Sequence, residues 1–486
     1  MISVGHLAGH QARHVPVTTN TRPGHGVRIT DITDLTQKVI LSPELSAAKP
    51  QRSPIAWTPA SRRRIVAERH LASANTQKAQ ERLADAVGKL KHDSAAVRLA
   101  AVHALARFAD EDPAHRQACI DILCSAVRAV PVPRPDKDDR EKGGERWRTW
   151  RGDRACRHAI LSVIAAHLRV GAAISWRGSD LDFSGVVFDS GEPPARSADG
   201  MSGFTGAGLT GAKVSFAGAQ FTGGAVSFAG AQFTGAKVSF AGARFTGAKV
   251  SFAGAKFAAG EVSFAGAKFA AGEVNFAGAK FSGAKVTLLG AEFTGGGVSF
   301  TGAEFAGGKV SFCSHFAGGA VAFLGSRFTG GAVSFLDAEF TGGAIGFLDA
   351  EFTGGEVSFV GAVFTGSEVS FVGAEFTGTT VNFVGAKFAH GMVSFVGAEF
   401  TGGEVKFRWA EFSGSEVRFS GASFDGGQID FAQAKFGGGE VDFTSVHFSR
   451  GLVDLSGAIG WSAPPSFDDW ITSPACLQLP ARSGLA

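Results

Sequence analysis

Several residue types are scarce or missing in this chain of 486 residues, and each absence excludes a class of protein. There is no tyrosine, there are only three methionines, and no proline occurs between positions 195 and 463. An ordinary globular enzyme uses the residue types more evenly, so this bias indicates internal repetition. The five cysteines are too few and too scattered for a disulfide framework, which favours a reducing compartment.

A charge excess and long apolar runs are missing as well. The 47 lysines and arginines nearly balance the 44 aspartates and glutamates, so no global charge points to nucleic acid or to a membrane. The first residues contain no apolar stretch of signal-peptide length. The most apolar candidate span, 159–176, contains His167 and Arg169. We therefore expect a cytoplasmic protein with no membrane span and no membrane partner.

The N-terminal part divides into two segments. Residues 1–60 lack apolar periodicity and are predicted to be disordered. Residues 61–175 are predicted to form a helical module, because apolar residues recur there at spacings of three and four. A proline- and charge-rich loop is expected at 130–153, followed by a fourth helix at about 154–170. This alternation of short amphipathic helices resembles a HEAT-like helical pair.

Phenylalanine follows a strict period in the second part of the chain. Between Phe216 and Leu455 an aromatic residue or leucine stands at every twelfth position with one exception, and a second series runs five positions behind the first. All 44 phenylalanines except Phe108 and Phe467 belong to these series or to their upstream extension. The core positions predicted from them include Phe216, Phe221, Phe228, Phe264, Phe269, Phe335 and Phe395.

The residues around each member of a series indicate how the chain folds there. Each member ends an apolar–polar–apolar triplet, such as Val214-Ser215-Phe216, in which two side chains point inward and one outward. Glycine, alanine and threonine between the triplets suit tight corners. A unit this short cannot bury its own phenylalanine, but stacked coils bury ring on ring. The pattern therefore predicts a β-solenoid over residues 178–460.

The repeat unit resembles that of a known family. Val-Ser-Phe-Ala-Gly at 214–218 and Ala-Gln-Phe-Thr-Gly at 219–223 have the form of consecutive units of the pentapeptide-repeat family. That resemblance implies a coil with four sides. A two-residue insertion after every second unit makes a 12-residue double repeat. Two geometries stay open: a four-sided coil made of two double repeats, which we prefer, and a two-sided coil made of one.

These observations predict an architecture that is α+β by domain. An N-terminal α-helical module covers the first coil of a long quadrilateral β-solenoid, which resembles pentapeptide-repeat proteins. Residues 461–486 are expected to form a C-terminal cap and tail, with Trp461, Phe467 and Trp470 folded over the last coil.

The predicted interior offers no chemistry. Phenylalanine, valine and alanine contain no titratable group, so no acid, base or nucleophile is expected inside the solenoid. We therefore expect a protein that is not an enzyme, without catalytic residues, cofactor or metal. The segment 206–211 matches the GxGxxG pattern, but it lies inside the repeat and opens no helix, so its glycines are interpreted as corner residues.

Three other segments carry reactive or basic residues. Cys313-Ser314-His315 lies at the one shortened step of the first series, from Phe312 to Phe323. One cysteine and one histidine could bind a metal ion, but without a second pair of ligands they make a poor metal site. Cys119 and Cys124 are five positions apart on a predicted helix, which favours core packing. The stretch 146–151 mixes arginine with tryptophan, a composition that stacks on nucleic-acid bases. We interpret those tryptophans as helix-packing residues, so nucleic acid is not expected as a partner.

The outward charges differ between the two halves of the solenoid. Residues 201–290 contain 8 Lys and Arg against 2 Glu, whereas residues 291–456 contain 8 Lys and Arg against 18 Asp and Glu. Tandem duplication produces such runs without any partner, but a charged partner would relieve the repulsion within them. The candidate interaction surface comprises Arg244, Lys256, Lys268, Lys280, Glu339, Glu351, Glu375, Glu399 and Glu411.

These features predict a non-enzymatic protein-interaction or scaffolding protein whose rigid surface binds an unidentified protein partner. The family resemblance implies an alternative, because some pentapeptide-repeat proteins mimic DNA. In that case the acidic residues between 337 and 442 would regulate a topoisomerase or another DNA-binding enzyme. A homo-oligomer formed through the solenoid ends stays open.

Overall fold

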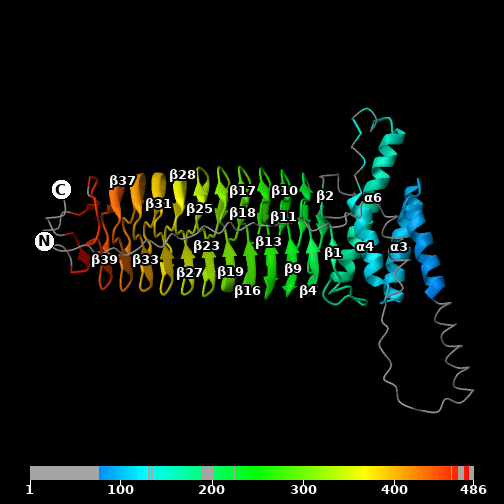
Figure 1. The fold of residues 1–486 in the computed structure, drawn as a ribbon, viewed down its shortest axis with the longest axis horizontal. Helices are drawn as coiled ribbons and strands as arrows, with labels where there is room; N and C mark the ends of the chain where they lie inside the picture. The colour runs from blue at the N-terminus through cyan, green and yellow to red at the C-terminus, as the bar shows by residue number, and fades with distance from the viewer. Residues whose placement is uncertain are drawn as a thin grey trace, which may run out of the picture.

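The computed structural model describes residues 76–129, 141–188, 201–223, 225–460, 462–468 and 475–480, and single positions between 130 and 140. Helical residues 76–90 come first, followed by α3 (Ala95–Glu111), α4 (Arg116–Arg128) and α6 (Glu145–Leu168). Strands then follow from β1 (Leu181–Asp182) to β41 (Leu477–Gln478). The chain is thus α+β by domain, a small group of helices at one end of a long β-solenoid (Figure 1). The segment 1–60 lies outside the described residues.

The helices pack through the apolar residues that the sequence pattern identifies. Val102 and Leu105 of α3, Ile120 of α4 and Ile164 of α6 are all buried. Cys119 and Cys124 of α4 are also buried, in the same core. Burial of this apolar stripe on each helix supplies most of the stability of such a small module.

The expected loop at 130–153 is wrong in its second half, because α6 begins at Glu145. Helical spacing explains the difference. The rings of Trp147 and Trp150 stack with centroids 4.8 Å apart, and the Arg154 guanidinium lies 5.0 Å from the Trp150 ring centroid. Side chains three and four residues apart meet on one face of a helix, so this stretch is stabilised as a helix by its own side chains.

One coil of the solenoid comprises two double repeats and has four sides. β10 (Arg244–Phe245) pairs in parallel with β14 (Lys268–Phe269), and β12 (Lys256–Phe257) pairs in the same way with β16 (Lys280–Thr287). Paired positions are therefore 24 apart in the sequence, which excludes the two-sided coil made of one double repeat. Successive strands in the chain alternate by pairs between two parallel sheets.

The two sheets occupy opposite sides of the rod (Figure 1). Within the described residues, sheet 1 contains 22 strands, among them β12 and β16, and sheet 2 contains 19 strands, among them β10 and β14. Each sheet covers two of the four sides, and a short corner joins the two sides. The wider turns that connect one sheet to the other form two seams along the rod.

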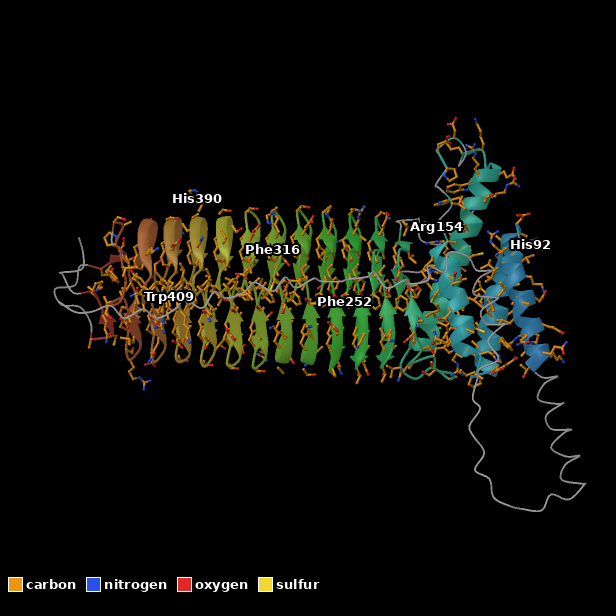
Figure 2. The ribbon with its side chains drawn as sticks, viewed as in Figure 1. His92, Arg154, Phe252, Phe316, His390 and Trp409 are labelled. Atoms are coloured by element: carbon orange, nitrogen blue, oxygen red, sulfur yellow. The ribbon has the colours of Figure 1, made fainter. Side chains whose placement is uncertain are left out.

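The core consists of columns of phenylalanine rings. Phe252 and Phe276 stack with centroids 4.7 Å apart, which matches the spacing of paired strands. Rings of neighbouring columns meet edge to face, as Phe252 and Phe264 do at 86°. Figure 2 shows Phe252 and Phe316 within the rod, whereas His390 stands at the outer edge of sheet 2. The seven predicted core residues are all buried: Phe216, Phe221, Phe228, Phe264, Phe269, Phe335 and Phe395.

The coil stays in register across the single shortened step. His315 still pairs with Glu292 one coil earlier, and Phe316 still pairs with Phe293. Ser314 occupies the buried position that alanine has in most coils, and its hydroxyl donates to the Leu288 carbonyl oxygen at 2.5 Å. The deletion therefore removes one residue from an exposed turn and leaves the strands and the core intact.

The solenoid continues beyond its expected end at residue 460. β40 (Ser466–Phe467) pairs with β37 (Lys435–Phe443), and β41 pairs with β39 (Leu452–Asp454). The Phe467 ring stacks on Phe443 with centroids 5.3 Å apart, so this phenylalanine extends a core column. It stands twelve positions after Leu455 and is therefore a further member of the first series, which was predicted to end at Leu455. Trp461 and Trp470, predicted to cover the end, lie outside the described residues.

Candidate interaction surface

The candidate surface is built from the outward residue that precedes each phenylalanine of the second series. Because one coil comprises two double repeats, outward positions 24 apart are neighbours and those 12 apart lie on opposite sheets. Lys256 and Lys280 are neighbours on sheet 1, and Arg244 and Lys268 are neighbours on sheet 2. The four cations of the candidate surface, which stand at successive 12-residue steps of the sequence, therefore do not form one run along the rod: they are two separate pairs on opposite sides of it.

Each of these pairs is followed by a glutamate. The Lys268 ammonium lies 2.9 Å from Glu292, and the Lys280 ammonium lies 2.8 Å from Glu304. All four side chains are about half exposed, so each ion pair contributes at most about 1 kcal/mol. The repulsion expected within the basic half is thus partly relieved inside the chain itself.

Two of the five acidic candidates lie on sheet 2, among residues of mixed sign. Glu339 lies 3.2 Å from His315, and the Lys435 ammonium donates to Glu411 at 2.9 Å. This hydrogen bond, with the positive charge of Lys435, lowers the pKa of the Glu411 carboxyl. Lys387 precedes Glu411 in the same column, one coil earlier. Sheet 2 therefore carries no continuous acidic surface over these described strands.

The other three acidic candidates are stacked on sheet 1. Glu375 lies between Glu351 and Glu399 on adjacent strands. Of these three, only Glu351 has a described cation in an ion pair with it, the Arg327 guanidinium at 3.0 Å. We define the charged column as the charged outward residues that precede the second-series phenylalanines of sheet 1, from Lys256 to Glu399. It comprises Lys256, Lys280, Glu304, Arg327, Glu351, Glu375 and Glu399.

Both sheets change from basic to acidic along the rod, and the change is larger on sheet 1. Lysine dominates the strands of its N-terminal half, and glutamate dominates those of its C-terminal half. The N-terminal set is Lys213, Lys237, Lys256, Lys280, Lys285 and Lys309 against Glu261 and Glu304. The C-terminal set, up to β33 (Glu404–Lys406), is Glu351, Glu356, Glu375, Glu399 and Glu404 against Arg327 and Lys406.

A row of apolar side chains beside the charged column was not predicted. We define the seam row as the residues three positions before each member of the column, at the turn from sheet 2. Leu324 and Leu348 of this row are 40% and 38% exposed. The row comprises Ala253, Ala277, Thr301, Leu324, Leu348, Val372 and Val396. Its signal in the sequence is the change from alanine to leucine and valine at a position where no core residue is expected.

The remaining motifs do not form a site. Gly206 has φ +67° in a turn that leads into β4 (Gly208–Thr210), so the GxGxxG segment is a corner of the coil. No group of three or more His, Cys, Asp and Glu side chains within the described residues is placed to hold a metal ion. In the same part of the chain, no helix is both long and apolar enough to cross a membrane.

Neither a scan against protein-family models, nor a search of curated proteins, nor a search of solved structures gave a match.

Proposed function

We propose that this chain is a non-enzymatic interaction protein that presents the charged sheet 1 of a rigid solenoid to a macromolecular partner. The observation that carries the proposal is the separation of charge on that sheet, with lysines toward the helices and glutamates toward the C-terminus. Stacked rings and parallel strands make the rod stiff, so these charges keep fixed spacings.

The interior supports a role without catalysis. The buried polar side chains of the solenoid are hydroxyls, and most of them bond to backbone carbonyls. Ser326, for example, donates to the Phe300 carbonyl oxygen at 2.7 Å, and Thr379 donates to that of Gly354 at 3.0 Å. A hydroxyl held in this way has no neighbouring base to activate it as a nucleophile.

Site-specific crosslinking tests the proposal. A photoreactive residue is placed at outward Ser358 of sheet 1, and in a matched control at outward Ser370 of sheet 2. We expect the sheet 1 probe to capture a discrete macromolecule at low salt and the sheet 2 probe to capture much less of it. Equal capture by both probes contradicts the proposal, and so does turnover of a small molecule that one substitution abolishes.

DNA mimicry is the second candidate, and the stacked carboxylates of Glu351, Glu375 and Glu399 favour it. A mimic of duplex DNA needs negative charge on more than one side of the rod. The alternation of Glu339, Lys387 and Glu411 on sheet 2 argues against such a surface, so we rank this function second. A supercoiling assay with a topoisomerase tests this function. If micromolar concentrations of the protein leave supercoiling unchanged, DNA mimicry is excluded.

A further inference from the structure

The signs of the charged column have an internal symmetry. From Lys256 to Glu375 the six residues read plus, plus, minus, plus, minus, minus. Reversing the order and inverting every sign gives the same series. A second copy that runs antiparallel along this column therefore meets an opposite charge at every level. We call the position of one coil along the rod a level. The symmetry axis passes between the level of Glu304 and the level of Arg327.

The two residues without a partner inside the chain meet in this arrangement. Lys280 is paired with Glu304 and Arg327 with Glu351 in the same copy. Among the residues that the structure describes, neither Lys256 nor Glu375 has an ion-pair partner. In an antiparallel pair of rods, Lys256 of one copy stands opposite Glu375 of the other, and this contact occurs twice.

The seam row is self-complementary in size about the same axis. Its N-terminal half consists of the small residues Ala253, Ala277 and Thr301, and its C-terminal half of Leu324, Leu348 and Val372. Antiparallel pairing places each large apolar side chain of one copy opposite a small residue of the other. Thr301 faces Leu324, Ala277 faces Leu348, and Ala253 faces Val372. Such pairs fill space without a clash and bury the exposed leucines.

The second column of sheet 1 is compatible with the same axis, although its signs are not themselves symmetric. Its outward residues precede the valines of the first series, from Lys237 to Glu404. Reversal about the same level places Lys237 opposite Glu404 and Lys285 opposite Glu356. The other two pairs join a charged residue to a neutral one, Glu261 to Thr380 and Lys309 to Ala332. No like charges are brought together along this described column.

Sheet 2 does not share this property. Its corresponding column contains Lys268 and Lys387, which lie at equal distances from the level between His315 and Glu339. Reversal about that level places the two lysines opposite each other. About this central level of the rod, charge complementarity therefore favours sheet 1 over sheet 2 as the contact between copies.

We propose that two copies of this chain associate side by side and antiparallel, through the charged column and the seam row. This inference rests on the proposed function and names the partner, a second copy of the chain. The eight levels from Lys237 to Glu404, spaced by about 4.8 Å, make a face about 38 Å long, and four or five residues across it span about 15 Å. Such a contact buries roughly 600 Å² per copy, at the lower end of the range for standard stable interfaces.

The two parts of this interface have different roles. Exposed ion pairs contribute little free energy, so the charged column sets the direction and the register of the two rods. The leucines and valines of the seam row supply the apolar area that holds the copies together. The dimer is therefore expected to weaken as salt screens the charges, without dissociating completely.

Sedimentation of the purified full chain tests the proposal, because charge reversal has a specific signature here. Lys256→Glu places two glutamates opposite each other twice, and Glu375→Lys does the same with two lysines. We expect each variant alone to dimerise at least about tenfold more weakly than the wild type. An equimolar mixture of the two variants is expected to recover wild-type affinity. In the mixed dimer the glutamate introduced at position 256 of one copy faces the lysine introduced at position 375 of the other.

The matched control is Arg244→Glu, which reverses an exposed cation on sheet 2 and should leave dimerisation unchanged. Circular dichroism and thermal unfolding of every variant verify that the fold is retained. A monomer at all accessible concentrations at low salt overturns the proposal, and so does a dimer that neither charge reversal weakens. Neither result removes the proposed function, which the crosslinking of Ser358 to another macromolecule tests separately.

Discussion

Phe264 lies directly on Phe240, one coil earlier, with ring centroids 4.8 Å apart and ring planes only 5° apart. Both rings are completely buried. The contact joins positions 24 apart in the sequence, so it forms only when a whole coil has closed. Each ring of the core is therefore stabilised by the coils before and after it, as expected for a repeat protein in which neighbouring units provide the stability.

Replacing Phe264 with alanine is expected to destabilise the solenoid by about 3–5 kcal/mol. The substitution removes a buried ring from the middle of a column and leaves a cavity that flanking coils cannot fill, because their strands hold them at a fixed spacing. Urea unfolding followed by circular dichroism measures the total loss. Hydrogen exchange of the amides in the neighbouring coils shows where it occurs.

Ser263 provides the control for that measurement. Its side chain points outward and accepts only a long hydrogen bond, 3.4 Å from the Ala265 amide. Ser263→Ala is expected to cost less than about 1 kcal/mol. A loss as large as that of Phe264→Ala would mean that the assignment of inward and outward residues is wrong.

The sequence correctly predicts which residues lie inside the solenoid. It does not predict which outward residues are neighbours on its surface. Phe264 and Val262 recur with a period that only an inward column explains. A coil made of one double repeat and a coil made of two bury the same side chains, so the pattern alone does not decide which outward residues are neighbours. That is why Arg244 and Lys256 looked like members of one run, although they lie on opposite sheets.

The helical region shows a second limit of prediction from sequence. Prolines and charges before Arg146 indicate a loop, but they do not indicate where it ends. The contacts among Trp147, Trp150 and Arg154 extend α6 toward the N-terminus. The end of the solenoid is similar, because Phe467 keeps the twelve-residue step from Leu455 but follows Pro464 and Pro465, which interrupt the repeat pattern.

Gly343 is expected to tolerate no side chain. It has φ +82°, and a Cβ atom built on it would lie 2.0 Å from the Gly319 carbonyl oxygen of the previous coil. Gly343→Ala must therefore separate two coils or break their backbone pairing. We expect a loss of more than about 2 kcal/mol, measured by urea unfolding.

Gly278, at a seam turn, is the matched control. Its φ is +64°, but no atom lies within 4 Å of a Cβ built there. Asp349 occupies the corresponding position three coils later with φ 52°, so the turn accepts a side chain that tolerates this conformation. Gly278→Asp is expected to cost less than about 1 kcal/mol. Equal losses at Gly343 and Gly278 would show that backbone conformation, not the close approach of coils, limits both positions.

The buried thiols of α4 make stability dependent on alkaline pH. Burial raises the pKa of both Cys119 and Cys124 to about 12, and for Cys119 the nearby Asp112 carboxylate adds to the effect. Between pH 9 and 12 the unfolded thiols lose protons that the folded thiols keep. The unfolded state then binds fewer protons, so the free energy of unfolding falls as the pH rises through this window.

Alkylation with iodoacetamide at pH 9 checks this directly, because the thiolate is the reacting form. Cys119 and Cys124 are expected to react at least about 100-fold more slowly in the native chain than in urea. Mass spectrometry of the digested protein gives both rates, with the half-buried Cys476 as an internal reference. Native rates equal to the unfolded ones would mean that α4 does not shield its thiols.

Asp110 is expected to control how the helices attach to the first coil. Its carboxylate accepts a hydrogen bond from the completely buried Trp176 indole at 2.8 Å and lies 3.1 Å from His167 Nε2. Asp110→Ala leaves that indole N–H without an acceptor, so we expect a loss of about 1–3 kcal/mol and faster hydrogen exchange around Trp176, with the middle of the solenoid unchanged. Asp110→Asn, which keeps an acceptor oxygen, should recover part of the loss.

Asp85→Ala, which removes an exposed ion pair with Lys89, should have little effect. If Asp85→Ala and Asp110→Ala change exchange at Trp176 equally, the carboxylate does not fasten the helices to the solenoid.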